Sequence, residues 1–432
     1  DTGPHRWYTK SDMVNQWLLE FMGDEIIKIP RLTRIYFDKK FFYYPIKFKN
    51  VISGIGLIKA TQSVIDYLWS RVMARVSPKN AITLEDGYIE KFGNTLYKTF
   101  FKRYSEKLWG RSCKEVSSDW IGQRTRGFNI GTIIKDALFK TPGVVSFVDE
   151  FSYPKQGIGR IADKLAEEAK KQGGVILVDS KVTKIEHSGD QIKKVTVQTG
   201  KKMQEFTADY IISTIPLSDL VFSLSPRASS TAVGFAKKLS YRDQVEVALF
   251  INKENITPDT WIYVHPENIS FMRMMEMANW NKQLSPKGKT TLVFEISCDY
   301  GDRMWSMKDS ELIKMVSNEF VREFGLISDD DILGGYVHRV EKEYPVYHIG
   351  YRTDVDSIKH YVKQFKNLQI AGRNGTFRYN NMDHSIEMGL YAAWNIIEGK
   401  HVYDIESVNI EREYLEEKKL ELPEDEYVEK EE

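Results

Sequence analysis

The chain has 432 residues, of which 42% are hydrophobic and 28% charged, and its 61 basic and 61 acidic residues cancel to a net charge of zero. This length allows two or three domains with substantial cores, and the composition is that of an ordinary soluble globular protein. The neutral total argues against a strongly basic nucleic-acid binder, and the absence of an 18-residue apolar run argues against a membrane span.

The first 140 residues predict a mainly helical region with one hairpin. Ser11 is a suitable N-cap for a helix over residues 11–22, which carries apolar residues on one face. Residues 31–48 predict two short strands around a turn at 38–40. Residues 54–140 are mostly helical by their apolar period.

The rest of the chain alternates between strand and helix patterns. We expect, in order, a strand end, glycine turn and helix (151–174), alternating strands (175–200), a further strand (208–217), strand-like runs between 240 and 300, an amphipathic helix (310–324), and a strand, loop and final helix (367–397). From about Glu411 the chain is highly charged and predicts a disordered tail. This alternation indicates a mixed α/β protein.

The two cysteines, Cys113 and Cys298, lie far apart in the sequence. They have neither the spacing of a metal site nor that of a disulfide framework. His5 and His384 also lack a partner at metal-ligand spacing. We therefore expect no metal, and a cytoplasmic location, where thiols stay reduced.

The segment GIGRIA places Gly157, Gly159 and Ala162 at the spacing of a nucleotide-binding turn. A dinucleotide fingerprint follows a buried apolar strand, however, and YPKQ precedes this segment. The apolar run VILVD, ending in Asp179, does follow the helix. We interpret the glycines as the structural start of a helix.

Residues 371–396 carry the strongest signal in the chain. A buried strand leads to Gly372, where backbone can approach a ligand closely, and Arg373 and Arg378 can meet anionic oxygens. The following turn opens a helix whose N-terminus favours negative charge. The pattern fits a ligand site and a capped core helix with exposed arginines equally well.

The segment GRNGTFRYNNMDHSI (372–386) closely resembles the C-terminal flavin-binding segment of the FAD-dependent protoporphyrinogen-oxidase-like and amine-oxidase-like oxidoreductases, a family related to the UDP-galactopyranose mutases. Four other segments resemble the family in the same order: GPHRWYTK (3–10), YSEKLWG (104–110), YPKQGIGRIADKLAEEAKKQGG (153–174) and ADYIISTIPLSDL (208–220). The resemblance implies an FAD/NAD(P)-binding Rossmann-like domain with a strand-rich and helical substrate domain.

The resemblance also implies a division of the chain. We expect a remnant of the FAD domain (1–10), a mainly helical substrate or cap region (11–145), the second part of the FAD domain (146–225), a substrate domain with an antiparallel sheet (226–365), a C-terminal FAD-binding segment (366–400) and the charged tail (411–432). In the family, a glycine-rich βαβ unit precedes the segment that GPHRWYTK resembles. We expect that this chain lacks the unit and, as written, holds FAD weakly.

Several residues take cofactor roles by the same resemblance. Gly372 and Arg373 would line the FAD pyrophosphate, and Met382 and Asp383 would place backbone N–H groups near the flavin pyrimidine edge. The backbone of Val182 would contact adenine. His5 would lie near the flavin ring and is the residue expected in catalysis.

Two activities follow from the family, both acting on a small molecule. The first is an oxidoreductase that transfers a hydride from its substrate to FAD. The second is a mutase that acts on a nucleotide sugar with reduced FAD as nucleophile. Residues expected to hold its diphosphate or sugar are Arg273, Tyr344, Tyr347, Arg378, Tyr379 and, by packing on a ring, Trp109. A third possibility is a non-enzymatic binding module.

Overall fold

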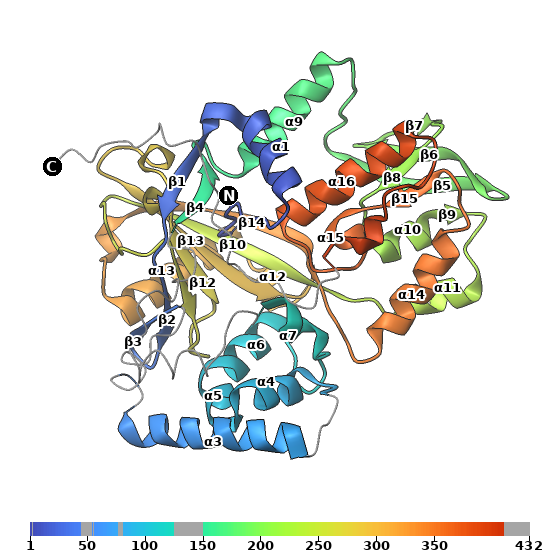
Figure 1. Ribbon diagram of the computed structural model, residues 1–432. Coiled ribbons are helices and arrows are strands. Elements are labelled where there is room, and N and C mark those ends of the chain that lie inside the picture. The colour runs from blue at the N-terminus through green and yellow to red at the C-terminus, as the bar shows by residue number, and fades with distance from the viewer. Residues whose placement is uncertain (2, 45–53, 55, 77–80, 125–149, 410–432) are drawn as a thin grey trace.

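A computed structural model describes residues 1, 3–44, 54, 56–76, 81–124 and 150–409 of the chain (Figure 1). The predicted charged tail, and the end of the predicted helical region beyond Arg124, lie outside these residues. Within them, no helix is long and apolar enough to cross a membrane.

The largest sheet has seven strands and forms the centre of the molecule. Its order is β14 (Ile332–Pro345), β10 (Tyr241–Ile251), β13 (Thr290–Cys298), β12 (Arg273–Glu276), β11 (Trp261–Val264), β2 (Thr33–Phe37) and β3 (Lys40–Tyr43). All neighbours are antiparallel except β11 and β2. Helix α13 (Asp309–Phe324) packs Leu312, Val316 and Phe320 against this sheet, so its amphipathic pattern has the predicted role.

A second group of strands and helices lies beside the large sheet (Figure 1). Its strands are β5 (Ser180–Ser188), β6 (Gln191–Thr199), β7 (Lys202–Phe206), β8 (Ile211–Ser213), β9 (Leu224–Ser225) and β15 (Leu368–Ile370). Its helices are α10 (Leu217–Ser223), α11 (Ser230–Ala236), α14 (Tyr351–Val362), α15 (Gly372–Gly375) and α16 (Met382–Ile397). Strands β7-β6-β5-β9 form one sheet, and β15 pairs with β8 in parallel.

The expected strand character of residues 175–179 is wrong. The first strand of this group begins at Ser180, and Val175, Ile176, Leu177 and Val178 are 41–82% exposed without regular structure. Apolar alternation was therefore a poor guide here, because no neighbouring strand in the described residues pairs with this run.

The helical region folds largely as predicted. Ser11 accepts a hydrogen bond from the N–H of Val14 and caps α1 (Asp12–Met22). Further helices are α3 (Leu57–Val76), α4 (Leu84–Phe92), α5 (Asn94–Leu96), a π-helical turn (Tyr97–Phe101), α6 (Lys102–Trp109) and α7 (Asp119–Arg124). The hairpin predicted at 31–48 is β2 and β3, which join the large sheet. These two strands lie within the predicted helical region (11–145), but they belong to the same sheet as the strands of the predicted substrate domain (226–365).

Two strands far apart in sequence form a separate two-stranded sheet. Strand β1 (Ile26–Pro30) pairs antiparallel with β4 (Glu150–Pro154), and the glycine turn after β4 opens α9 (Gly159–Lys171), as expected. A buried aromatic cluster fastens β4 to the large sheet. In it Trp280 lies 4.9 Å from Phe151 and 5.0 Å from Tyr153 between ring centroids. The indole N–H of Trp280 donates to the carbonyl of Thr260 at 2.8 Å.

We expect Trp280→Ala to lower the free energy of unfolding by about 3–5 kcal/mol, because a fully buried ring is lost and a cavity remains. Urea denaturation followed by far-UV circular dichroism measures the change. Tyr300, which is 68% exposed, is the control, and Tyr300→Ala should cost about 0.5 kcal/mol or less. Equal effects of the two substitutions would contradict the structural role of this cluster.

Candidate functional site

A cavity of about 1030 Å³ lies where the large sheet meets the helical region and helix α16. Its wall combines the N-terminal segment, strands β11 and β12, the end of β14, helices α6 and α9, and the start of α16. Ligand pockets are usually about 300–1,000 Å³. The cavity therefore has room for a large ligand, or for two smaller molecules side by side.

The start of α16 forms the positive end of the cavity wall. Met382, Asp383 and Ser385 line the cavity from the first turn, and Gly389 lines it one turn later. A helix N-terminus carries N–H groups without intrahelical partners and about half a unit of positive charge. Gly389 has no atom within 4 Å of the position that a Cβ would take, so the helix surface is open there.

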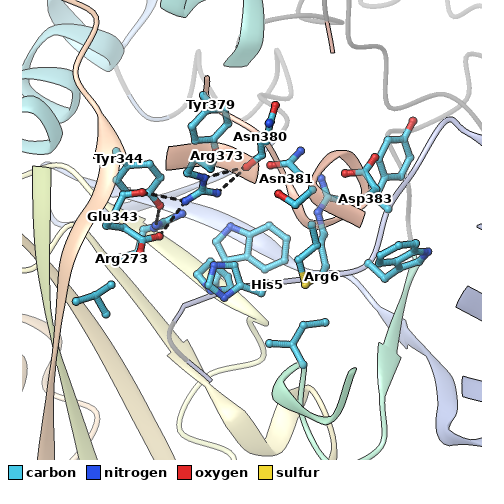
Figure 2. A pocket seen from close by; sticks show the side chains of 18 of the residues that line it. His5, Arg6, Arg273, Glu343, Tyr344, Arg373, Tyr379, Asn380, Asn381 and Asp383 are labelled. Atoms are coloured by element: carbon cyan, nitrogen blue, oxygen red, sulfur yellow. Dashed lines mark hydrogen bonds and ion pairs between the residues drawn. The ribbon is translucent and has the colours of Figure 1, made fainter. Parts of the chain in front are cut away.

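Arg373 connects this helix start to the large sheet (Figure 2). Its Nε and Nη2 donate to the carbonyl of Asn380 at 3.0 and 2.8 Å. Its Nη1 donates at 3.1 Å both to the carbonyl and to the carboxylate of Glu343. The guanidinium also lies 5.1 Å from the ring centroids of Tyr344 and Tyr379. The side chain is therefore fixed at the cavity wall.

A second arginine reaches the cavity from β12. Arg273 forms an ion pair with the fully buried carboxylate of Glu295. Its Nη2 donates to the hydroxyl of Tyr344 at 3.2 Å (Figure 2). Glu295 raises the pKa of Arg273, against the opposing effect of burial. Burial also raises the pKa of Tyr344 to about 12. Arg273 is thus charged and Tyr344 a neutral hydroxyl donor at neutral pH.

Two further groups change their usual protonation at this end. Burial, with Arg373 and Arg273 nearby, lowers the pKa of His5 to about 3. Burial raises the pKa of Asp383 to about 7. His5 is therefore a neutral imidazole at neutral pH, and Asp383 is partly protonated. Both pKa shifts leave less charge on these two buried side chains at neutral pH.

Another part of the cavity wall is aromatic. Tyr104 from α6 lies 5.6 Å from Tyr263 and 5.1 Å from His265 between ring centroids. Tyr44 contacts Tyr263 at 5.2 Å. Burial, with Lys107 nearby, lowers the pKa of His265 to about 3, so this ring is neutral as well. Flat, uncharged groups fit such a compartment.

The structure brings together seven of the twelve predicted site residues around this cavity: His5, Arg273, Tyr344, Arg373, Tyr379, Met382 and Asp383. The other five, Trp109, Val182, Tyr347, Gly372 and Arg378, do not line it. Contact with a ligand remains a prediction for all twelve.

The five outlying residues have visible structural roles. Trp109 is fully buried and packs edge-on against Trp120 at 4.6 Å. Tyr347 is also buried, and its hydroxyl accepts from the backbone N–H of Tyr379 at 2.7 Å. Arg378 donates to the carbonyls of Glu406 and Val408, both at 2.7 Å.

Val182 and Gly372 lie in the backbone framework of the second strand group. Val182 pairs with Val197 in β5 and β6 and packs against that group's core. Gly372 has φ +76, a conformation that favours glycine, at the turn from β15 into α15.

Several cavity residues were not singled out from the sequence: Arg6, Arg31, Tyr104, Tyr263, His265, Glu343 and Asn380. Tyr104 and Trp109 are five residues apart on α6 and about 140° apart around the helix. The two side chains therefore face different ways, and Tyr104 is the one that lines the cavity. For strand and loop residues such as His265, only the tertiary arrangement brings them to the site.

Comparisons with known proteins agree with this architecture. The family described as flavin containing amine oxidoreductase matches residues 30–397. A reduced UDP-galactopyranose mutase has a TM-score of 0.77 at 18% identity, covering 94% of this chain and 85% of that one. A protein assigned as a protoporphyrinogen oxidase, from Exiguobacterium sp. 255-15, has a TM-score of 0.63 at 13% identity, covering 90% and 87%.

Cyclohexylamine oxidase from Brevibacterium oxydans IH-35A has a TM-score of 0.58 at 13% identity, covering 89% of this chain and 85% of that one. A search of curated proteins gives no match. At these identities, the solved structures establish a shared mixed α/β fold.

We expect the raised pKa of Asp383 to make stability fall with rising pH. The pKa of the carboxyl is near its ordinary value of 3.8 in the unfolded chain and near 7 in the folded protein. The folded state therefore loses about 1.4 kcal/mol per pH unit between these values, and nothing further above pH 7. Asp383→Asn removes this penalty and should gain about 2–3 kcal/mol relative to wild type on going from pH 5 to pH 8.

Urea unfolding at the two pH values measures this gain. Asp356→Asn at an exposed position should retain the pH dependence of the wild type. A gain that is the same at pH 5 and pH 8 would show that Asp383 does not titrate in this range.

Proposed function

The chain belongs to the flavin-containing amine oxidoreductase family, and on that premise we propose that it is an FAD-dependent oxidoreductase acting on a small molecule. The observation that carries the proposal is that the positive start of α16 and the aromatic residues Tyr104, Tyr263 and His265 line the same cavity. A flat anionic cofactor suits the first, and a substrate beside it suits the second.

The residues present fit FAD. Arg373 and the N–H groups at the start of α16 would hold negative charge, either on the pyrophosphate or on the pyrimidine edge of the flavin. Ile158, Ile161 and Ile386 supply apolar wall for the rings. Bound FAD would supply the hydride acceptor, while the protein binds, orients and shields the reacting molecules.

His5 is suited to a place near a flavin ring. Its imidazole is neutral over the physiological range because its pKa is lowered to about 3. It can therefore donate or accept a hydrogen bond without adding positive charge. Asp383, one helical turn from Ile386, can hold a proton near neutral pH.

A second candidate function, a nucleotide-sugar isomerase that uses reduced flavin, is favoured by the arginines. Arg6, Arg31 and Arg273 all line the cavity in addition to Arg373. Arg6 and Arg31 lie 5.8 and 5.1 Å from the Trp261 ring. A cationic amine would be repelled by this set, whereas a diphosphate would be attracted.

We expect Arg373→Ala to weaken FAD binding by about 1.5–3 kcal/mol, or roughly 10–150-fold in Kd, the scale of a charge-assisted hydrogen bond. Fluorescence titration of the full chain with FAD measures the effect. Arg378→Ala is the matched control, because its guanidinium bonds outside the cavity, and it should leave Kd within about twofold. Equal losses in the two variants would remove Arg373 from the cofactor site.

The two activities differ in their use of electrons, and this gives the functional test. An oxidoreductase should bleach the flavin absorbance when an oxidisable substrate is added anaerobically, and should recover colour with an acceptor. An isomerase should convert UDP-galactopyranose only after the flavin has been reduced with dithionite. Conversion under those conditions, without bleaching by any amine or porphyrinogen, would replace the oxidoreductase proposal with the second candidate.

A further inference from the structure

Among the described residues, helix α3 (Leu57–Val76) packs on the protein through the face that carries its buried residues. Ala60, Ser63 and Tyr67 are its buried residues, and they face α4 and α5. Asp66 accepts a hydrogen bond from the backbone N–H of Thr95 at 3.0 Å. Gly93 lies so near α3 that a Cβ there would be 2.9 Å from its backbone. The helix is therefore held closely through small residues.

The opposite face of α3 is apolar and exposed. It consists of Leu57, Ile58, Ile65, Leu68, Trp69, Val72, Met73 and Val76, each 40–86% exposed. At about 100° per residue, these side chains centre on the side of the helix away from Ala60, Ser63 and Tyr67. Figure 1 shows α3 along one edge of the molecule, with α4 and α5 on its inner side. The large apolar residues thus point outward.

The apolar area of this stripe is close to the area that each partner buries in a stable dimer. The eight exposed fractions correspond to roughly 700 Å² of apolar surface at ordinary side-chain areas. The largest apolar patch on a typical monomer is about 300–600 Å². A standard interface buries about 800 Å² per partner. The stripe alone supplies most of that area.

The spacing of the stripe indicates a helix as its occupant. Ile58, Ile65 and Val72 are seven residues apart, and Leu68 follows Ile65 by three. In a heptad pattern these are the a positions and one of the d positions, the other two d positions being Thr61 and Arg75. β-branched residues at a are typical of two-stranded parallel packing. A membrane-surface helix needs its polar face free and basic. The face of α3 opposite the stripe is instead covered by α4 and α5.

We propose that this stripe on α3 binds the same stripe on a second copy of the chain. The contact is isologous, so one surface supplies both sides of the interface and the assembly closes as a dimer. Trp69, 65% exposed, contributes the aromatic anchor that such interfaces concentrate their binding energy on. The inference does not depend on the cofactor or the substrate.

Light scattering during size-exclusion chromatography of the full chain tests the proposal. The wild type should have about twice the 50.2 kDa mass of the single chain. Leu68→Glu should shift it to the monomer mass, with a dimer dissociation constant raised at least 100-fold. Leu333→Glu is the matched control, since Leu333 is 53% exposed on β14, and this variant should remain dimeric.

Circular dichroism of Leu68→Glu should match the wild type, and Val72→Lys should give the same shift to monomer. A monomeric wild type at 50 µM, or a dimer that persists in both variants, would overturn the proposal. So would a monomeric wild type that co-sediments with phosphatidylglycerol vesicles and loses that binding in Leu68→Glu. That result would assign the stripe to a membrane surface.

Discussion

The site depends on how Arg373 is held. One guanidinium uses its donors on the carbonyl of Asn380, just before α16, and on Glu343, near the end of β14. The helix start is thereby fixed to the large sheet, which carries another part of the cavity wall. The guanidinium is half-buried and fully engaged by these acceptors, and the pairing also links two elements that are distant in sequence. The direction of the positive end of α16 follows from this contact.

The charges around that contact are balanced so that the cavity keeps a positive character. Glu295 neutralises Arg273, and Glu343 neutralises part of Arg373. Asp383 and His5 then shift toward their neutral forms. With His5 neutral and Asp383 only partly ionised, the helix N-terminus and the arginine donors dominate the local field. An anionic ligand therefore experiences less opposing negative charge than the sequence count of acids would indicate.

Sequence patterns identified the parts of this fold that depend on local chemistry. The cap at Ser11, the hairpin of β2 and β3, the glycine turn into α9 and the loop before α16 are all as expected. Long-range pairings were not accessible, because nothing local brings β2 beside β11 or β1 beside β4. For the same reason, Arg373 was found from its own segment, whereas its partner Glu343 and the ring of His265 were not. The run at 175–179 failed because apolar alternation describes a strand only where a partner strand exists.

The helical region links the aromatic compartment to the surface of α3. Tyr104 projects into the cavity from α6, which follows directly on the π-helical turn and α5. Helix α3 rests on α4 and α5 through its small residues and through Asp66. Helix α6 is also joined to the large sheet, because the carbonyl of Leu108 accepts from Nε of Arg242 on β10 at 3.0 Å and from Oγ of Ser297 on β13 at 2.6 Å. Tyr104 is therefore positioned by the sheet as well as by the neighbouring helices, and its ring lies 5.6 Å from Tyr263 and 5.1 Å from His265 between centroids.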